Sequence, residues 1–246
     1  MNLKGGCMDK KERLDKILSN MGYGSRKQIK AKIKSGLVKV DKKVIKSNSH
    51  KVNPYESLIE FKDEKVEYRE YIYIMMNKPA GVVSATEDNI HKTVIDLLEN
   101  KYQIFNPFPV GRLDKDTEGF LLLTNDGQLA HNLLSPKKHV NKIYYVEVEG
   151  ELKENDKESF ERGIDIGEEK ITMPAKLDII DSGSTSKGYV TIREGKYHQI
   201  KRMFKALGKQ VVYLKRISMG EITLDKDLKL GDYRELNQTE LDMLKR

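Results

Sequence analysis

A short polar stretch at the centre of the chain holds the side chains best suited to chemistry: Arg112, Asp114, Asp116, Thr117 and Glu118. The apolar run 120–123 follows at once and predicts a buried strand. Ionisable groups at the mouth of a buried strand are costly unless they are paired or used. An ionised carboxylate there can act as a nucleophile or a general base. Alternatively, an internal Arg–Asp ion pair simply holds the loop together.

The rest of the sequence argues against several other kinds of catalytic site. It holds no phosphate-cradling glycine loop, no His-rich metal motif, and no Ser, His and Asp at a recognisable spacing. Its single cysteine, Cys7, cannot form an internal disulfide, and no Cys/His cluster indicates zinc. We therefore expect carboxylate, tyrosine and basic side chains to do the chemistry, with neither metal nor cofactor.

Positive charge is concentrated at the N-terminal end of the chain. Residues 1–70 hold 18 Lys and Arg against 10 Asp and Glu, whereas the remaining residues hold 27 against 28. A strongly basic end on a nearly neutral remainder favours a polyanion-binding module joined to a second domain. A Lys-rich surface that serves only solubility would give the same count.

Whole-chain features favour a protein of the cytoplasm. A length of 246 residues suits one large or two small domains. No apolar run approaches the roughly 20 residues needed to span a bilayer, and the first ten residues lack the apolar centre of a secretory signal. Together with the lone cysteine, these features favour a reducing compartment and no membrane partner.

The polar loop carries a long and specific family pattern. The sequence Gly-Arg-Leu-Asp-Lys-Asp-Thr-Glu-Gly at 111–119, followed by an apolar strand and by Thr-Asn-Asp-Gly at 124–127, resembles the signature of the RsuA/RluB-type RNA pseudouridine synthases. In that family the aspartate at the position of Asp114 is the essential catalytic residue. The resemblance implies isomerisation of a uridine, in which the bond between ribose and the uracil nitrogen breaks and the base is rejoined through carbon.

Three further segments match motifs of the same family. Residues 77–81, Asn-Lys-Pro-Ala-Gly, resemble the segment that opens the synthase domain. Residues 142–144, Lys-Ile-Tyr, resemble a motif whose tyrosine lines the uridine pocket, although a strand tyrosine such as Tyr144 is by itself more often part of a core. Residues 195–204, Gly-Lys-Tyr-His-Gln-Ile-Lys-Arg-Met-Phe, resemble a motif in which a turn leads into a helix.

The resemblance gives each matched side chain a role. Asp114 is expected to be catalytic, and Tyr144 to stack on a uracil that has left its stack in the RNA. Lys201 is expected to pair with Asp114, with Arg202 as the alternative for that role. Arg112 is expected to fill the space that the flipped nucleotide vacates or to hold the neighbouring backbone.

The basic N-terminal segment predicts a small RNA-binding module. Apolar residues at helical spacing predict a helix over 11–21, and Ser25 with Gln28 three residues on predicts the capped start of a second helix. Residues 11–58 resemble the RNA-binding module named after the fourth protein of the small ribosomal subunit. Point charges on the second helix suit phosphate neutralisation. The residues expected to bind RNA there are Arg26, Lys27, Lys30 and Lys34.

These observations predict two domains of α+β class. The RNA-binding module is expected over residues 9–61, a charged linker over 62–70, and the catalytic domain over 71–246. Helices and strands of the larger part alternate irregularly, without regular βαβ spacing, which favours a mixed, largely antiparallel sheet with flanking helices.

We expect a monomeric enzyme that acts on ribosomal RNA or on an assembling ribosomal subunit. The compact length favours 16S RNA of the small subunit as the substrate. The same chemistry on 23S RNA of the large subunit is one alternative, and a non-catalytic RNA-binding or ribosome-assembly protein is another. Binding alone does not require Asp114, Tyr144 and Lys201 together, which favours the enzyme.

Overall fold

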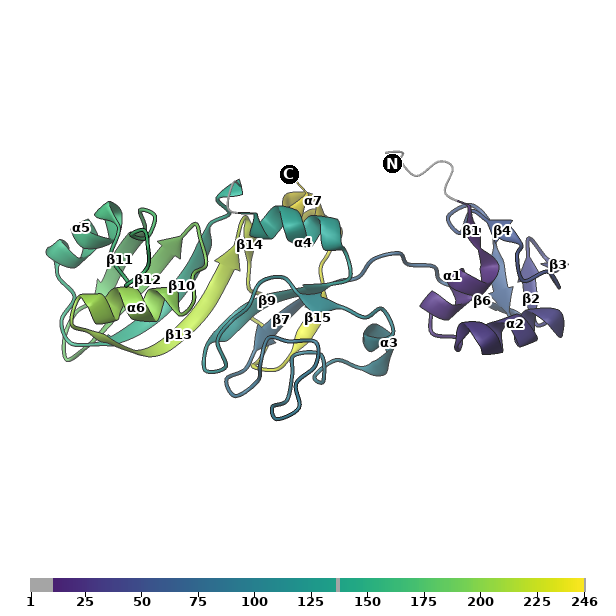
Figure 1. Ribbon diagram of the computed structural model, residues 1–246, viewed down its shortest axis with the longest axis horizontal. Helices are drawn as coiled ribbons and strands as arrows, with labels where there is room; N and C mark the ends of the chain where they lie inside the picture. Colours follow the sequence, from purple (N-terminus) through teal and green to yellow (C-terminus); the bar gives the residue numbers. More distant parts are fainter. Residues whose placement is uncertain (1–10, 136–137, 246) are drawn as a thin grey trace. The chain divides into compact units, whose positions relative to one another are not determined.

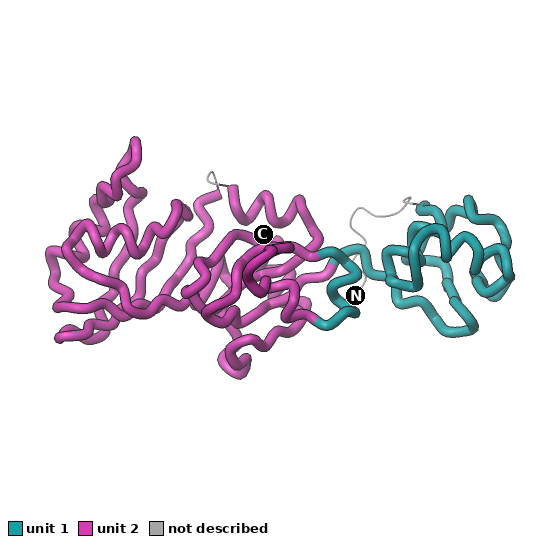
Figure 2. The backbone as a smooth tube through the Cα atoms, turned by 60° about the horizontal axis from the view of Figure 1, so that its bottom comes forward, with its two compact units in different colours: residues 1–71, 99–106 teal, residues 72–98, 107–246 magenta. Residues whose placement is uncertain are grey.

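The computed structural model describes residues 11–135 and 138–245 (Figure 1). The chain forms two compact units (Figure 2). The first holds residues 11–71 with Glu99–Asn106, and the second holds Ile72–Leu98 with residues 107–245. Cys7 and the first two residues of the predicted RNA-binding module lie outside the described residues. Within the described part of the chain, no helix has the length and apolar character needed to cross a membrane.

The first unit combines short helices with a small antiparallel sheet. Its helices are α1 (Leu14–Asn20), α2 (Arg26–Lys34) and α3 (Asn100–Gln103). Its sheet has the strand order β3-β2-β5-β6, and β1 pairs separately with β4. The strands are β1 (Glu12–Arg13), β2 (Val38–Val40), β3 (Lys43–Val44), β4 (Lys51–Val52), β5 (Ile59–Phe61) and β6 (Glu64–Lys65).

Helix α2 has one buried face and one basic face. The Ser25 hydroxyl accepts a bond from the Gln28 N–H at 3.3 Å, and the Gln28 side chain accepts one from the Ser25 N–H at 2.9 Å, so the predicted capping box is formed. Ile29 and Ile33, one turn apart, are fully buried in the core of the unit. The exposed side chains of α2 include Arg26, Lys27, Lys30 and Lys34.

The beginning of the predicted linker is part of the first unit. Lys62 and Asp63 have φ of 53° and 67° and form a two-residue hairpin turn. Glu64–Lys65 then pairs with β5, and Val66 is buried in the core. Residues 62–66 therefore do not form a linker. The prediction missed the hairpin because its turn carries Lys-Asp in place of the usual glycine-containing pair.

The second unit is built on a nine-stranded sheet. The strand order is β11-β12-β10-β13-β9-β7-β15, with β14 paired to β13 and β8 paired to β9. Among the described strands, only β13 and β9 pair in parallel. The mixed, largely antiparallel sheet that we predicted is therefore confirmed. The strands are β7 (Tyr73–Lys78), β8 (Phe108–Pro109), β9 (Glu118–Thr124), β10 (Lys142–Glu149), β11 (Lys176–Asp181), β12 (Thr185–Ile192), β13 (Gln210–Met219), β14 (Ile222–Thr223) and β15 (Tyr233–Glu235).

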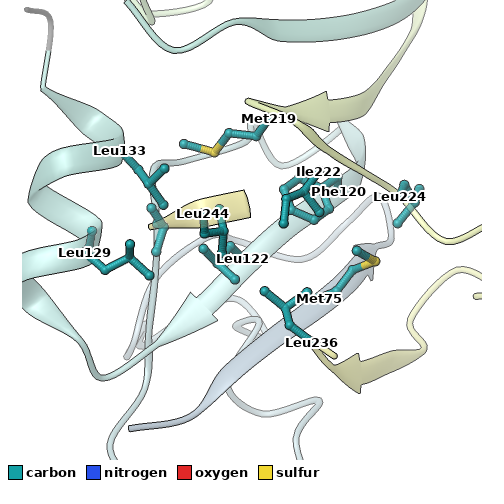
Figure 3. Packing of buried hydrophobic residues seen from close by; sticks show 12 residues of the cluster. Met75, Phe120, Leu122, Leu129, Leu133, Met219, Ile222, Leu224, Leu236 and Leu244 are labelled. Carbon is teal, nitrogen blue, oxygen red and sulfur yellow. The ribbon is translucent and has the colours of Figure 1, made fainter. Parts of the chain in front are cut away.

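Helices of the described residues flank this sheet (Figure 1). They are α4 (Gly127–Leu134), α5 (Glu154–Arg162), α6 (Gln199–Ala206) and α7 (Gln238–Leu244). Helix α6 packs against β13, and α5 packs against β11. The predicted apolar strand is β9, whose side chains Phe120 and Leu122 are fully buried and pack with Leu129 of α4 and Leu244 of α7 (Figure 3). This core fixes the strand that follows the polar loop.

The polar loop ends where β9 meets β13. The two strands pair there through Lys215 with Glu118 and Arg216 with Gly119. Gly119 has φ of 101°, and a Cβ at that position would lie 2.2 Å from the carbonyl oxygen of Arg216. Only glycine allows this approach, so the glycine that closes the family pattern joins the two parts of the sheet at the end of the loop.

Candidate active site

The polar loop is supported from inside the protein by a buried lysine. Lys78 ends β7 with a side chain that is fully buried. Its Nζ donates to the carbonyl oxygens of Asp114 at 3.1 Å, Lys115 at 3.3 Å and Thr117 at 2.9 Å, and to that of Pro79 at 3.0 Å. An ammonium group carries three protons, so these four acceptors share its full donor capacity. The backbone from Asp114 to Thr117 is thereby fixed.

A second contact holds the loop on its N-terminal side. The Ser84 hydroxyl donates to the Leu113 carbonyl at 3.0 Å, and the Leu113 N–H donates back to the same hydroxyl at 3.1 Å. The Gly81 N–H donates to the Lys115 carbonyl at 2.8 Å. The segment that follows β7 therefore braces the loop that precedes β9, and the position of Asp114 follows from these paired backbone groups.

The Asp114 carboxylate faces the first turn of α6. Lys201 Nζ lies 3.1 Å from one carboxylate oxygen, and His198 Nε2 lies 3.4 Å from the other. Lys201 also binds Asp116 at 2.5 Å. Among the described residues no ion pair joins Arg112 to Asp114. The alternative interpretation, a loop held by an internal Arg–Asp pair, is therefore wrong, and the cation comes from a helix 87 positions further along the chain.

The charges of this cluster keep Lys201 protonated. Burial lowers the pKa of Lys201, but hydrogen bonds and charge from Asp116 and Asp114 outweigh burial and raise it. Burial raises the pKa of Asp116, but Lys201 outweighs this effect and the net change is downward. Burial lowers the pKa of Lys78 to about 8, although Asp116 and Asp114 oppose the change. Two cations thus stabilise negative charge on the loop.

A pocket opens beside Asp114. Tyr144 of β10 lines it with a side chain that is only 7% exposed, and Leu214 and Ile192 add apolar surface from the neighbouring strands. Tyr145 takes the opposite face of the sheet, where its hydroxyl donates to Glu147. The pocket combines an aromatic side chain, apolar side chains and a paired carboxylate, which is the mixture of surfaces typical of a small-ligand site.

The two predicted arginines lie in different environments. Arg112 lines the pocket, is exposed, and has no hydrogen bond or ion pair within the described ranges. Arg202 does not line the pocket. Its Nη1 donates to Glu168 at 2.6 Å and to the Tyr197 carbonyl at 3.0 Å, and its Nη2 donates to the Ile166 carbonyl at 2.5 Å. Arg202 therefore braces the turn before α6, and Lys201 is the residue that pairs with Asp114.

The sequence interpretation missed two residues of this site. His198 stands at the N-cap of α6 and shares its first turn with Lys201, and this spacing of three places both side chains on the face that meets Asp114. Lys78 belongs to the Asn-Lys-Pro-Ala-Gly motif, but its role was not recognised. A lysine that directly continues a buried apolar strand is the signal that would have found it, because such a residue is buried only with partners.

Comparison with known proteins assigns the chain to a family. The model of the RNA pseudouridylate synthase family matches residues 72–206, which include the loop, the pocket and the start of α6. A model of the S4 domain matches residues 12–56, in the first unit. The chain belongs to the RNA pseudouridylate synthase family.

Relatives of this synthase match it over nearly its full length. The RNA pseudouridine synthase YtzG of Bacillus subtilis is 55% identical over 94% of this chain and 98% of the relative. Ribosomal small subunit pseudouridine synthase A of Vibrio cholerae is 42% identical over 93% and 97%, respectively, and its Escherichia coli counterpart is 36% identical over 93% and 98%. A crystal structure of a pseudouridylate synthase, 38% identical, covers 94% of this chain and 99% of its own with a TM-score of 0.67.

Proposed function

We propose that this synthase converts a specific uridine of small-subunit ribosomal RNA to pseudouridine, with Asp114 as its catalytic residue. The observation that carries the proposal is the Asp114 carboxylate, held 3.1 Å from the Lys201 ammonium in a pocket lined by Tyr144. The preference for small-subunit RNA rests on the relatives named for that activity.

The reaction is an isomerisation that needs only groups of this kind. The bond between ribose C1′ and uracil N1 breaks, the uracil turns in the pocket, and C1′ bonds to C5. The hydrogen on C5 leaves as a proton, and N1 gains one, so no electrons are exchanged with a partner. An ionised carboxylate can act on the sugar or the base, and the Lys201 ammonium lies 3.1 Å from the Asp114 carboxylate.

The surrounding side chains position the nucleotide. The target base must leave its stack to reach Asp114, and the buried Tyr144 offers it an aromatic surface. Arg112 is exposed at the pocket with no ion pair among the described residues, so it is available to hold the RNA backbone or to fill the vacated space. Arg202 has a structural role instead, because its guanidinium is engaged by Glu168 and by backbone carbonyls.

The first unit provides the non-specific affinity for RNA. The exposed cations of α2 can neutralise phosphates, and the match of this region to the S4 domain supports that role. We propose that the enzyme is a monomer of the cytoplasm and that it acts on the assembling small subunit. A base that must be extruded is accessible before ribosomal proteins cover the RNA.

Mapping pseudouridine in ribosomal RNA tests the proposal. Cells that lack this protein should lose one pseudouridine of 16S RNA, and the purified protein should restore it on RNA or assembling subunits from those cells with multiple turnovers. Loss of a site in 23S RNA would move the substrate to the large subunit. Binding of the RNA at one-to-one stoichiometry without any new pseudouridine would identify a binding protein and refute the enzyme assignment.

A further inference from the structure

A stacked pair of aromatic rings stands beside the pocket. The ring centroids of Tyr197 and His198 lie 3.8 Å apart with an angle of 18° between the ring planes. His198 lines the pocket, and its Nε2 lies 3.4 Å from the Asp114 carboxylate. Tyr197 does not line the pocket and is 74% exposed. The outer face of Tyr197 therefore extends the aromatic surface from the catalytic carboxylate into solvent.

The turn that carries the pair is firmly held. The Lys196 N–H donates to the Gln199 side chain at 3.0 Å, and Gln199 Nε2 donates to Glu194 at 2.7 Å. Arg202 Nη1 donates to the Tyr197 carbonyl. Lys196 Nζ donates to the Lys170 carbonyl at 2.9 Å. Because both ends of the turn are fixed in this way, a ligand would meet a preorganised ring.

The stacked pair of Tyr197 and His198 is not explained by a contribution to the stability of the fold. His198 has φ of 47°, a left-handed conformation that a non-glycine residue adopts at some cost in free energy. Tyr197 leaves most of its ring in water, where it contributes little to a core. Backbone conformations of this kind cluster at active sites and ligand contacts, and here one lies next to an exposed aromatic ring at the catalytic pocket.

We propose that Tyr197 is a stacking site for an unpaired nucleobase next to the target uridine in the RNA chain. The inference rests on the proposed function, because it needs a uridine at Asp114. A uridine in the pocket has His198 at its side, and a neighbouring base that stacks on Tyr197 lies one ring further out. Stacking on a flat ring accepts any base, so the site sets the register of the strand without reading its sequence.

The test compares three variants in single-turnover and steady-state assays on RNA with tritium at uracil C5. Tyr197→Phe keeps the ring, Tyr197→Leu keeps the apolar bulk without the ring, and Tyr197→Ala removes both. The control is Tyr189→Ala, which removes a tyrosine 40% exposed on β12. We expect Tyr197→Leu and Tyr197→Ala to raise KM by about 5- to 150-fold, the range of one base–aromatic stack, with kcat within about twofold. Tyr197→Phe and the control should match wild type.

RNA with one abasic nucleotide beside the target identifies the partner of Tyr197. On one side of the uridine, the abasic RNA should raise the KM of wild type and leave that of Tyr197→Ala unchanged. The stacking site would be refuted if an abasic nucleotide on either side of the target changed the KM of wild type and of Tyr197→Ala by the same factor. A wild-type KM for Tyr197→Leu would also refute it.

A fluorescence measurement distinguishes failure of the stacking site from failure of the proposed function. If wild type released no tritium at all, the function would be wrong. Quenching of 2-aminopurine in a single-stranded RNA by wild type, compared with Tyr197→Leu, would still decide whether a base stacks on Tyr197.

Discussion

Replacing Lys78 by methionine should separate the catalytic role of the loop from its contribution to stability. Methionine fills a similar volume but donates no hydrogen bond. The carbonyls of Asp114 and Lys115 keep the Thr117 and Gly81 N–H groups as donors, at 3.1 Å and 2.8 Å. The carbonyls of Pro79 and Thr117 no longer receive the ammonium protons that bind them in wild type. The loop is then free to shift toward solvent.

Two opposing contributions decide the stability of this variant near neutral pH. Removing the ammonium donor costs about 1–3 kcal/mol for each buried carbonyl left without a hydrogen bond. Against this, burial lowers the pKa of Lys78 from its ordinary 10.5 to about 8, so keeping the charged form buried costs about 3 kcal/mol. We therefore expect the free energy of unfolding to change by less than about 3 kcal/mol. A displacement of about 1 Å at Asp114 should lower kcat about 100-fold.

The pH dependence has a definite sign. The folded protein holds the Lys78 proton with a pKa of about 8, whereas the unfolded chain holds it up to about 10.5. Between these values the unfolded state binds more protons, so the free energy of unfolding of wild type rises with pH. Relative to Lys78→Met, wild type should gain up to about 3 kcal/mol across this window. The gain begins near pH 8 and is absent at pH 7.

Urea unfolding of both proteins between pH 7 and pH 10, together with tritium release at pH 7, measures these effects. Lys115→Met is the matched control, because Lys115 is an exposed lysine of the same loop. We expect the control to keep activity within about threefold and to show no pH-dependent difference. A Lys78→Met protein with wild-type kcat, or a stability difference that stays flat through pH 8–10, would refute the role given to this lysine.

Three other variants, each with its own control, test separate parts of the site and the fold. Lys201→Gln should lower kcat by about 100- to 1,000-fold in the tritium assay, whereas Lys205→Gln, one turn further on α6 and exposed, should leave it unchanged. Gly119→Ala should lower the free energy of unfolding by more than about 3 kcal/mol in urea, because its Cβ would meet the Arg216 carbonyl. Gly127→Ala, with open space around the added Cβ, should have little effect. Replacing three exposed lysines of α2 by glutamine should reduce the slope of log K against log salt for RNA binding by about 0.7–0.9 for each phosphate that is no longer neutralised, and an equal slope would contradict the RNA-binding role. The lysines are Lys27, Lys30 and Lys34, and a triple replacement in the second unit at Lys153, Lys176 and Lys226 is the control.

The sequence predicted the parts of the site that local patterns encode. Asp114 and Tyr144 belong to short motifs on a loop and on a strand, and both line the pocket. The family pattern predicted that Lys201, not Arg202, pairs with Asp114. The geometry of helix α6 explains this choice. One position of difference on α6 turns the side chain by about 100°, which directs Arg202 to Glu168 and Lys201 to Asp114.

Contacts between segments that are distant along the chain could not be predicted from the sequence. Lys78 donates hydrogen bonds to backbone carbonyl groups 36 to 39 positions further along the chain. Every residue has such a carbonyl, so the sequence does not indicate which ones will accept. His198 was visible as a residue, but its pairing with Asp114 depends on how α6 packs against β13. The hairpin at Lys62 and Asp63 was missed because both residues adopt positive φ without glycine. By contrast, the capping box at Ser25 was predicted, since it depends on residues only three apart.

The most direct test of the central claim is tritium release by Asp114→Asn beside Asp116→Asn. Both aspartates belong to one loop and both contact Lys201, at 3.1 Å and 2.5 Å, so the two variants lose a similar charge at a similar place. Asparagine keeps the size and removes only the carboxylate. We expect Asp114→Asn to release no tritium above background and Asp116→Asn to retain measurable turnover. Release by Asp114→Asn at a rate near that of wild type would contradict the claim that this carboxylate drives the isomerisation.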